Sequence, residues 1–444
     1  MEPEPGQGGR LAPPRRTCES RPRGRGESAI GAARVTERKN FLFLQGHHSP
    51  FWLELGDALK AEGHGVLKVR VSGQDILYWP RRGARWHRGT LAEWRPWVER
   101  LMREEGITDA LYYADRHPWN VASLEAAKAA GVRAWTIEFG YLRPHWLTLE
   151  PEAMGAHSRF PKDPEVIRRL GAPGEPDPTR DEARYPNGFL HEALADIGLF
   201  ASTIAFWGLF PHYRLDLPYS VVTHYAHWIW TLMRERGDER RAREVQGRCV
   251  AEGADYTLLA MQLAQDYQIR ASSPYDDYAD MIAEVLDSMA RAAPASRRLV
   301  VKMHPLDSDW RGWRKLAPAM ARERGLGDRV DLIRGGDLGA LIRHSKGAVM
   351  VNSTVGLHCL REGVPVIALG EAVYDIPGLT HQGTLDAFWT APEPVDRGLV
   401  ACFERALARE IQIRGSFFHK EGRRRAVAEA VDRLTRRPFP EWAH

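Results

Sequence analysis

The sequence LVVKMHPLD, residues 299–307, predicts a buried strand of five residues that ends in a polar turn. A second stretch, AVMVNST at residues 348–354, has the same design, and the pattern between the two predicts one further strand and one helix. Strands that alternate with helices are typical of parallel sheets, in which ligands bind beyond the carboxyl ends of the strands. We therefore expect the polar residues after the two strands to lie at neighbouring strand ends and to form a nucleotide site.

The same alternation extends along most of the chain. In the first half, helices separate four predicted strands, at 41–44, 66–71, 109–113 and 133–139. In the second half, further strands are predicted at 257–261, 330–333 and 364–368, and the last two helices at 399–411 and 420–436. Strands linked through helices imply right-handed βαβ units. We predict an α/β fold of the GT-B type, in which two Rossmann-like domains have a cleft between them.

Shifts in composition divide the chain into five predicted parts. They are a disordered basic N-terminal extension (1–39), an N-terminal Rossmann-like domain (40–150), an aromatic helical connection (151–253), a C-terminal Rossmann-like domain (254–418) and a closing helix (419–444). The first 40 residues hold nine Lys or Arg against five Glu, which accounts for the net charge of +4. This arm could contact anionic lipid or nucleic acid, but a disordered tail is the simpler interpretation. The neutral body gives no support for nucleic-acid binding.

The composition argues against several other classes of protein. The four cysteines are far apart and form no CxxC pair, which argues against a zinc ribbon or a disulfide framework and fits a reducing compartment. No window approaches 18 uncharged apolar residues, and the N-terminus lacks the apolar core of a secretory signal. We expect a cytoplasmic protein.

Aromatic side chains are concentrated in two predicted helical stretches, 189–207 and 221–233. Rings stack on sugars and tolerate membrane interfaces, so these helices could seat a lipid or an acceptor glycan. Ordinary helix packing is the favoured interpretation. His224 and His227 lie one turn apart, but a pair without a third ligand is a weak metal signal.

Residues that suit an anionic phosphate follow the second quoted strand. Asn352, Ser353 and Thr354 precede a predicted helix at 355–362, and the dipole at a helix N-terminus favours an anion. Ser and Thr are also standard caps, so capping alone is the alternative. Gly356, one turn into the helix, would let a ligand approach closely. We expect a phosphate site here.

The first quoted strand contributes His304, which Pro305 presents at a turn. A histidine can donate to a phosphoryl oxygen, or protonate it as it leaves. Lys302 could contribute, or could be a solvated edge residue. The carboxylates in the run 307–309 match the DxD pattern that holds a divalent metal in other transferases. A role in capping the turn is preferred, and no metal is expected.

Polar residues also end the strands of the first half, where we expect them to line one edge of the sheet. They are His47 and His48, Asp75, Asp115 with Arg116 and His117, and Glu138 with the run 140–144. Each alone is more often a turn residue than a catalytic one. Together they indicate a second wall of the site.

Five longer motifs follow one another within residues 41–418. They are EFGYLRP at 138–144, HPLD at 304–307, VNSTVGL at 351–357, YDIPGLT at 374–380 and LDAFW at 385–389. In these motifs the chain resembles the capsule polysaccharide biosynthesis and export family of the KpsS and LipB type. The resemblance implies a retaining β-Kdo glycosyltransferase that uses CMP-Kdo and a phosphatidylglycerol-type lipid, at the inner face of the cytoplasmic membrane.

The resemblance also implies roles for the two halves. The C-terminal half would bind the nucleotide sugar and the N-terminal half the acceptor. The expected nucleotide-sugar contacts are Gln262, Ser273, Lys302, His304, Pro305, Asn352, Ser353, Thr354 and Gly356. CMP-Kdo would be the donor substrate, with no cofactor.

Retention through two displacements needs a carboxylate nucleophile and a second group that alternates as acid and base. The resemblance favours Asp266 as the nucleophile, with Glu138 as the acid/base and Asp115 as the rival for either role. Arg143 or Arg270 would pair with the Kdo carboxylate, for which a planar guanidinium is suited.

Two alternatives stay open. One is a transferase for another CMP- or UDP-sugar, and the other is a non-catalytic adaptor of a capsule export complex. The joint presence of Glu138, Asp266, His304 and Asn352 argues against an adaptor, because a scaffold does not need that set.

Overall fold

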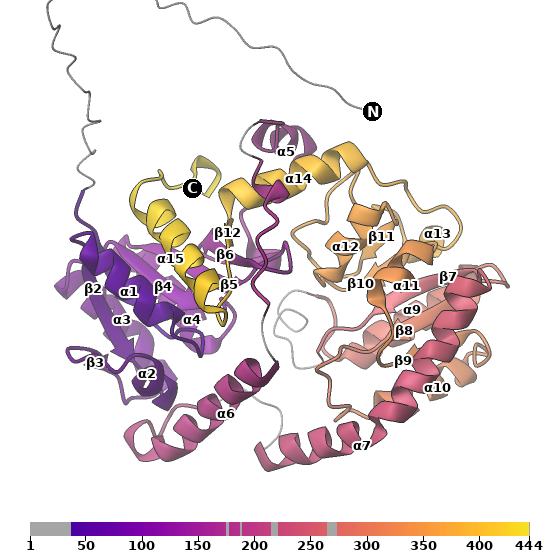
Figure 1. The fold of residues 1–444 in the computed structure, drawn as a ribbon, viewed down its shortest axis with the longest axis horizontal. Coiled ribbons are helices and arrows are strands. Elements are labelled where there is room, and N and C mark those ends of the chain that lie inside the picture. Colours follow the sequence, from indigo (N-terminus) through magenta and orange to yellow (C-terminus); the bar gives the residue numbers. More distant parts are fainter. Residues whose placement is uncertain (1–36, 175–176, 187–188, 215–220, 264–272, 444) are drawn as a thin grey trace, which may run out of the picture. The chain divides into compact units, whose positions relative to one another are not determined.

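Two separate β-sheets organise the chain (Figure 1). The first has the strand order β12-β6-β5-β4-β1-β2-β3, and the second has the order β11-β10-β7-β8-β9. This computed structural model describes residues 37–174, 177–186, 189–214, 221–263 and 273–443. Residues from Arg38 onward form one compact unit. The predicted α/β fold with two Rossmann-like sheets is confirmed.

The first sheet is parallel from β3 to β5. Its strands are β1 (Asn40–Phe43), β2 (Gly65–Arg70), β3 (Arg85–Trp86), β4 (Asp109–Tyr113) and β5 (Arg133–Phe139). The helices between them are α1 (Phe51–Ala61), α2 (Gly73–Tyr78), α3 (Leu91–Glu104) and α4 (Pro118–Ala130). The short elements β3 and α2 were not predicted. Chain order reverses between β1 and β4, because β2 and β3 lie on one side of β1 and β4 and β5 on the other.

Two antiparallel strands complete the first sheet. β6 (Trp146–Pro151) pairs with β5, and β12 (Gln412–Arg414) pairs with β6. The sequence placed 412–414 in the C-terminal half, which is wrong for this strand. It occupies an edge that β6 would otherwise leave unpaired, and it buries Ile413 in the core of the first sheet. A strand of three residues is too short for periodicity to reveal its sheet.

The second sheet is parallel throughout. Its strands are β7 (Tyr256–Ala260), β8 (Arg298–Lys302), β9 (Val330–Ile333), β10 (Ala348–Met350) and β11 (Val366–Ala368). The accompanying helices are α9 (Tyr278–Ala292), α10 (Trp313–Glu323), α11 (Leu338–His344), α12 (Val355–Glu362), α13 (Leu385–Phe388) and α14 (Arg397–Glu410). The expectation that β8 and β10 end as neighbours is wrong, since β7 lies between them.

Helices connect the two sheets. They are α5 (Pro164–Leu170), α6 (Phe189–Ala205), the 3-10 turn η3 (Trp207–Leu209) and α7 (Val221–Gln246), with a π-helical turn at Gly247–Ala251. α7 extends thirteen residues beyond the predicted end at Met233. None of the helices in the described ranges is long and apolar enough to cross a membrane.

The chain returns to the first half at its C-terminal end. α15 (Lys420–Thr435) packs beside α1, and its buried residues Ala426, Ala430 and Leu434 join the core of the first sheet (Figure 1). In β12, the amide of Gln412 accepts a hydrogen bond from Tyr141 N (2.8 Å) and donates one to Thr148 Oγ1 (2.9 Å). The end of the chain therefore fixes the loop after β5.

We expect the Gln412→Leu variant to lose about 2 kcal/mol of unfolding free energy. Gln412 is fully buried, so the apolar side chain would leave the Tyr141 N–H and the Thr148 hydroxyl without these partners. Urea denaturation measures the change, with exposed Gln382→Leu as the control. Equal stability of the two variants would contradict the role of Gln412.

Candidate active site

A cavity of about 580 Å³ is lined by loops that follow strands of both sheets. The first sheet contributes residues after β1, β4 and β5, and the second contributes residues after β7, β8 and β10. In each sheet these include the two strands between which the chain order reverses, β1 and β4 in the first and β7 and β10 in the second. Loops that separate in opposite directions leave a crevice at such a point, where open α/β sheets bind ligands.

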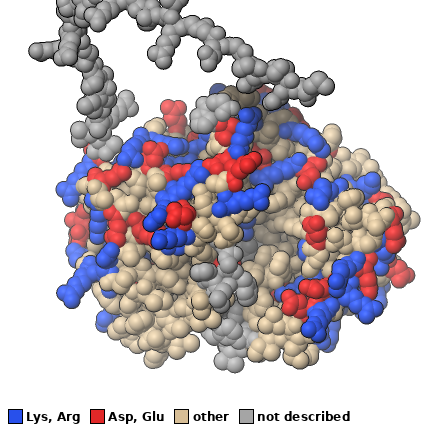
Figure 2. Space-filling view, viewed as in Figure 1, with Lys and Arg blue, Asp and Glu red and all other residues tan. Residues whose placement is uncertain are grey.

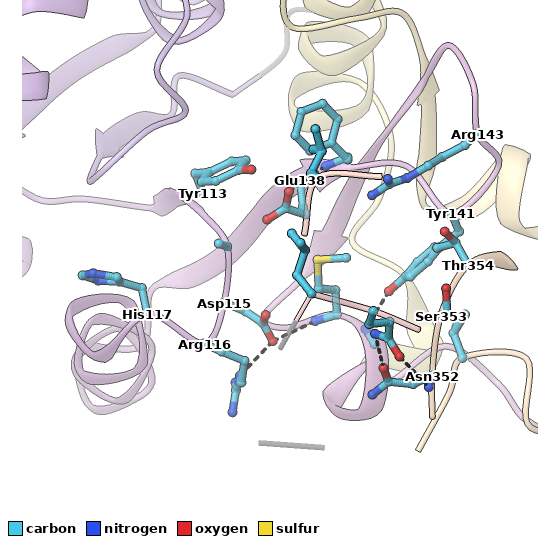
Figure 3. A pocket seen from close by; sticks show the side chains of 18 of the residues that line it. Tyr113, Asp115, Arg116, His117, Glu138, Tyr141, Arg143, Asn352, Ser353 and Thr354 are labelled. Atoms are coloured by element: carbon cyan, nitrogen blue, oxygen red, sulfur yellow. Dashed lines mark hydrogen bonds and ion pairs between the residues drawn. The ribbon is translucent and has the colours of Figure 1, made fainter. Parts of the chain in front are cut away.

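A reciprocal amide pair closes the crevice of the second sheet. Gln262 Nε2 donates to Asn352 Oδ1 (2.8 Å), and Asn352 N donates to Gln262 Oε1 (3.2 Å) (Figure 3). Gln262 follows β7 and Asn352 follows β10, so the pair joins the two central strands. Both residues line the cavity, where the sequence placed them.

His304 lines the same cavity from the end of β8. Burial lowers the pKa of His304 to about 4, and the positive charges of Arg143 and Lys302 add to this effect. The ring is therefore neutral at physiological pH. Because its Nδ1 accepts a hydrogen bond from Leu306 N (3.1 Å), the proton resides on Nε2. Of the two expected chemistries, the geometry favours donation of a hydrogen bond over protonation of a leaving phosphate.

The loop before α12 brings Ser353 and Thr354 to the cavity. Ser353 Oγ accepts from Val355 N (3.3 Å), and the Ser353 carbonyl accepts from the Tyr374 hydroxyl (2.6 Å). Gly356 does not line the cavity. A Cβ at this glycine would lie 2.4 Å from the Tyr374 ring, so the missing side chain makes room for the tyrosine. The hydroxyl of this ring, in turn, holds the loop 352–354 through the Ser353 carbonyl.

Three other expected contacts lie outside the lining of the cavity: Lys302, Pro305 and Ser273. Lys302 is buried, and its Nζ donates to the Gly335 carbonyl (2.5 Å), so the reading as a solvated edge residue is wrong. The carboxylates of the DxD run stabilise the local turn, which is the role that the sequence favoured over metal binding. Asp307 accepts from Asp309 N (2.7 Å), and Asp309 pairs with Arg314 (3.0 Å).

Glu138 lies on the opposite wall, at the end of β5 (Figure 3). Burial raises the pKa of Glu138 to about 7, although hydrogen bonds from Tyr113 and from Phe139 N (3.0 Å) favour the carboxylate. A carboxyl group with this pKa is present in both protonation states near neutral pH. It is therefore suited to accept and return a proton during a reaction.

Asp115 is buried at the end of β4 and also lines the cavity. Its Oδ2 accepts from Arg116 Nε (3.0 Å) and from Met154 N (3.2 Å) (Figure 3). Burial raises the pKa of Asp115, and Arg116 opposes the shift. Because its oxygen is bound by the loop around Met154, Asp115 is placed to shape the wall, and Glu138 is the better proton carrier.

Arg143 is exposed and lines the cavity, with its guanidinium 5.5 Å from the centre of the Phe139 ring. Within the described ranges, Arg143 forms no ion pair with an acidic side chain, so its charge is available to an anionic ligand. The expected nucleophile Asp266 and the second expected arginine, Arg270, lie outside the described residues. Their roles stay predictions.

Several cavity residues were not predicted as functional. They are Gln45, Gln74, Leu199, Phe200, Tyr213 and Glu371. Leu199 and Phe200 come from α6, where Asp196 Oδ1 lies 3.0 Å from Nε2 of His48 in the loop after β1. The aromatic content of α6 was the available signal, but a helical pattern does not show which side faces a cavity.

The family model for the capsule polysaccharide biosynthesis protein matches residues 108–418. The chain belongs to this family. The match includes the loops that carry Glu138, His304 and Asn352.

Two relatives extend the similarity over most of the chain. The capsule polysaccharide export protein KpsS of Escherichia coli is 32% identical over 381 residues, which cover 86% of this chain and 97% of KpsS. The capsule polysaccharide modification protein LipB of Neisseria meningitidis serogroup A is 26% identical over 391 residues, which cover 86% of this chain and 92% of LipB. The resemblance expected from the motifs is confirmed.

Among solved structures, KpsC of Thermosulfurimonas dismutans, a β-Kdo 2,7 transferase, covers 89% of this chain and 98% of its own. Its identity is 15% and its TM-score 0.44. A UDP-GlcNAc 2-epimerase of Methanocaldococcus jannaschii covers 89% of this chain and 99% of its own, with 12% identity and a TM-score of 0.25. At these identities the similarity concerns the fold alone.

We expect Gln262→Ala and Asn352→Ala each to weaken binding of cytidine monophosphate by about tenfold, and the double variant to do no worse than Gln262→Ala alone. Gln262→Ala removes both hydrogen bonds of the pair, whereas Asn352→Ala removes only the bond that its Oδ1 accepts and keeps its backbone N–H. The second substitution therefore has nothing further to break in the Gln262→Ala variant. Isothermal titration calorimetry gives the affinities, and Gln382→Ala, an exposed amide outside the cavity, is the control. Losses that simply add would show that the two amides act independently.

Glu138→Gln tests the raised pKa of Glu138 without any substrate. A folded-state pKa of about 7, above the ordinary glutamate value of 4.5, means that the wild type loses stability as the pH rises between these values. The glutamine variant escapes this loss, so it should exceed the wild type by up to about 3 kcal/mol at pH 8 and by almost nothing at pH 4. Denaturation across this range measures it. A constant difference at every pH would contradict the shift.

Proposed function

We propose that this member of the capsule polysaccharide biosynthesis family is a retaining glycosyltransferase. It transfers Kdo from CMP-Kdo to a (lyso)phosphatidylglycerol-type lipid. The observation that carries the proposal is that one cavity holds Glu138, with a pKa near 7, opposite the loop 352–354 at the start of α12 and the neutral ring of His304. A proton carrier facing a phosphate site is what transfer from a nucleotide sugar to a hydroxyl requires.

In the proposed reaction, the donor phosphate lies against the loop 352–354 and accepts a hydrogen bond from His304 Nε2. Arg143 pairs with the sugar carboxylate. The Asp266 carboxylate attacks the anomeric carbon of Kdo, and the bond to the CMP oxygen breaks, so CMP leaves with the electron pair. The acceptor hydroxyl then displaces Asp266, and Glu138 takes the hydroxyl proton.

A transfer assay tests this function. We expect wild-type protein, CMP-Kdo and a fluorescent lysophosphatidylglycerol to give a product heavier by one Kdo, detected by mass spectrometry. Because Glu138 acts as a base, the transfer rate should rise with pH through about 7. Glu138→Gln should lose about 10²- to 10⁴-fold in rate together with this pH dependence. Asp266→Ala should abolish transfer.

The same assay separates the alternatives. A product that forms only with another CMP- or UDP-sugar would show that this other sugar, and not Kdo, is transferred. Binding of cytidine monophosphate without transfer of any sugar would favour an adaptor. Unchanged turnover of Asp266→Ala would remove Asp266 as the nucleophile, while Glu104→Gln, an exposed glutamate of α3, is the control for the Glu138 variant.

A further inference from the structure

Large apolar side chains are exposed on the helices between the two sheets. Four belong to α6 and η3: Leu194, Ile197, Ile204 and Trp207. Four more belong to the first half of α7: Ile229, Trp230, Leu232 and Met233. These eight, which we call the apolar face, are two thirds of the twelve exposed large apolar residues in the described ranges. Such a concentration marks an interaction surface.

The opposite sides of these helices hold them in place. On α6, Ser202 is buried. A Cβ added at Gly73 of α2 would lie only 2.1 Å from the Ser202 carbonyl oxygen, so the two helices are in close contact. On α7, buried Thr231 donates to the Ser308 carbonyl (3.2 Å). The exposed residues therefore point away from the packed sides and have no core to enter.

Charged side chains are unevenly distributed over the visible surface. Figure 2 shows few of them over the lower left part of the view, where Figure 1 places α6, whereas they gather along the upper part over α14. At the polar border of the face, the Arg234 guanidinium lies 4.4 Å from the centre of the Trp230 ring. Tryptophan rings with an arginine beside them suit the headgroup level of a bilayer.

α6 also reaches the cavity. Leu199 and Phe200 line it, whereas Ile197 and Ile204 on the same helix are 48% and 66% exposed. A lipid whose headgroup reacts near Glu138 must place its acyl chain along an apolar path. α6 supplies that path, because one of its sides is in the cavity and the other is on the apolar face.

We infer that the apolar face lies on the surface of a phospholipid bilayer and that α6 guides the acceptor lipid from the bilayer into the cavity. The second part of this inference rests on the proposed function. A bilayer fits better than a second copy of the chain, because the face is continuous through α6 with the cavity that takes the lipid. An amphipathic face of this kind inserts only about 5–10 Å, so no spanning helix is needed.

Flotation of the full chain with vesicles of phosphatidylcholine and phosphatidylglycerol tests the apolar face. We expect the triple variant Ile204→Ser, Ile229→Ser, Met233→Ser to weaken vesicle binding by about tenfold or more, because apolar area sets the affinity of such faces. The matched triple variant with leucine at the same positions should bind like the wild type, as should Leu91→Ser, an exposed leucine of α3. Circular dichroism confirms that each variant is folded.

Three results would overturn the inference. They are wild-type protein that does not float, serine and leucine variants that float equally, and wild-type binding that disappears at about 0.5 M salt, which would indicate adsorption by charge alone. A wild-type dimer that the serine substitutions dissociate, without vesicle binding, would assign the face to a second copy. The flotation contains no CMP-Kdo, so its outcome does not depend on whether the wild type transfers Kdo in the assay above.

Discussion

The reversal of strand order in each sheet is the constraint on which the site depends. In the second sheet the chain builds β7, β8 and β9 to one side and then returns to place β10 on the other side of β7. Loops after β7 and β10 must therefore diverge, and the amides of Gln262 and Asn352 meet across the opening. The first sheet repeats the reversal at β1 and β4, so polar loops of both sheets line one cavity.

The electrostatics of the cavity follow from its partial burial. Removal from water lowers the pKa of His304 and raises the pKa of Glu138, and both shifts favour the uncharged form of the group. His304 becomes a donor without net charge, and Glu138 becomes a group that exchanges protons at neutral pH. Positive charge comes instead from Arg143, which stays exposed, while Lys302 is buried and donates a hydrogen bond to the Gly335 carbonyl.

The sequence predicted the elements that have strong local signals. The strands at 109–113 and 133–139 and the helix at 355–362 have the expected bounds, because short apolar runs end there at turns or caps. It did not predict the position of β7 between β8 and β10, because sheet order depends on contacts far apart in the chain. It identified Gln262 and Asn352 but not their pairing. It misjudged Gly356, whose neighbour Tyr374 is eighteen residues away.

The short strand β12 limits how the two halves can be exchanged between relatives. In the sequence, the half that holds the second sheet is enclosed by the half that holds the first, since β12 and α15 return to the first sheet after α14. A hybrid enzyme with a new second sheet therefore needs two junctions, one before β7 and one between α14 and β12. A single crossover would pair β6 with a foreign edge strand and would place a foreign residue at the position of Gln412, which holds Tyr141 at the wall of the cavity. Such an exchange would keep the loops of the second sheet intact and would damage the wall of the cavity that the first sheet contributes.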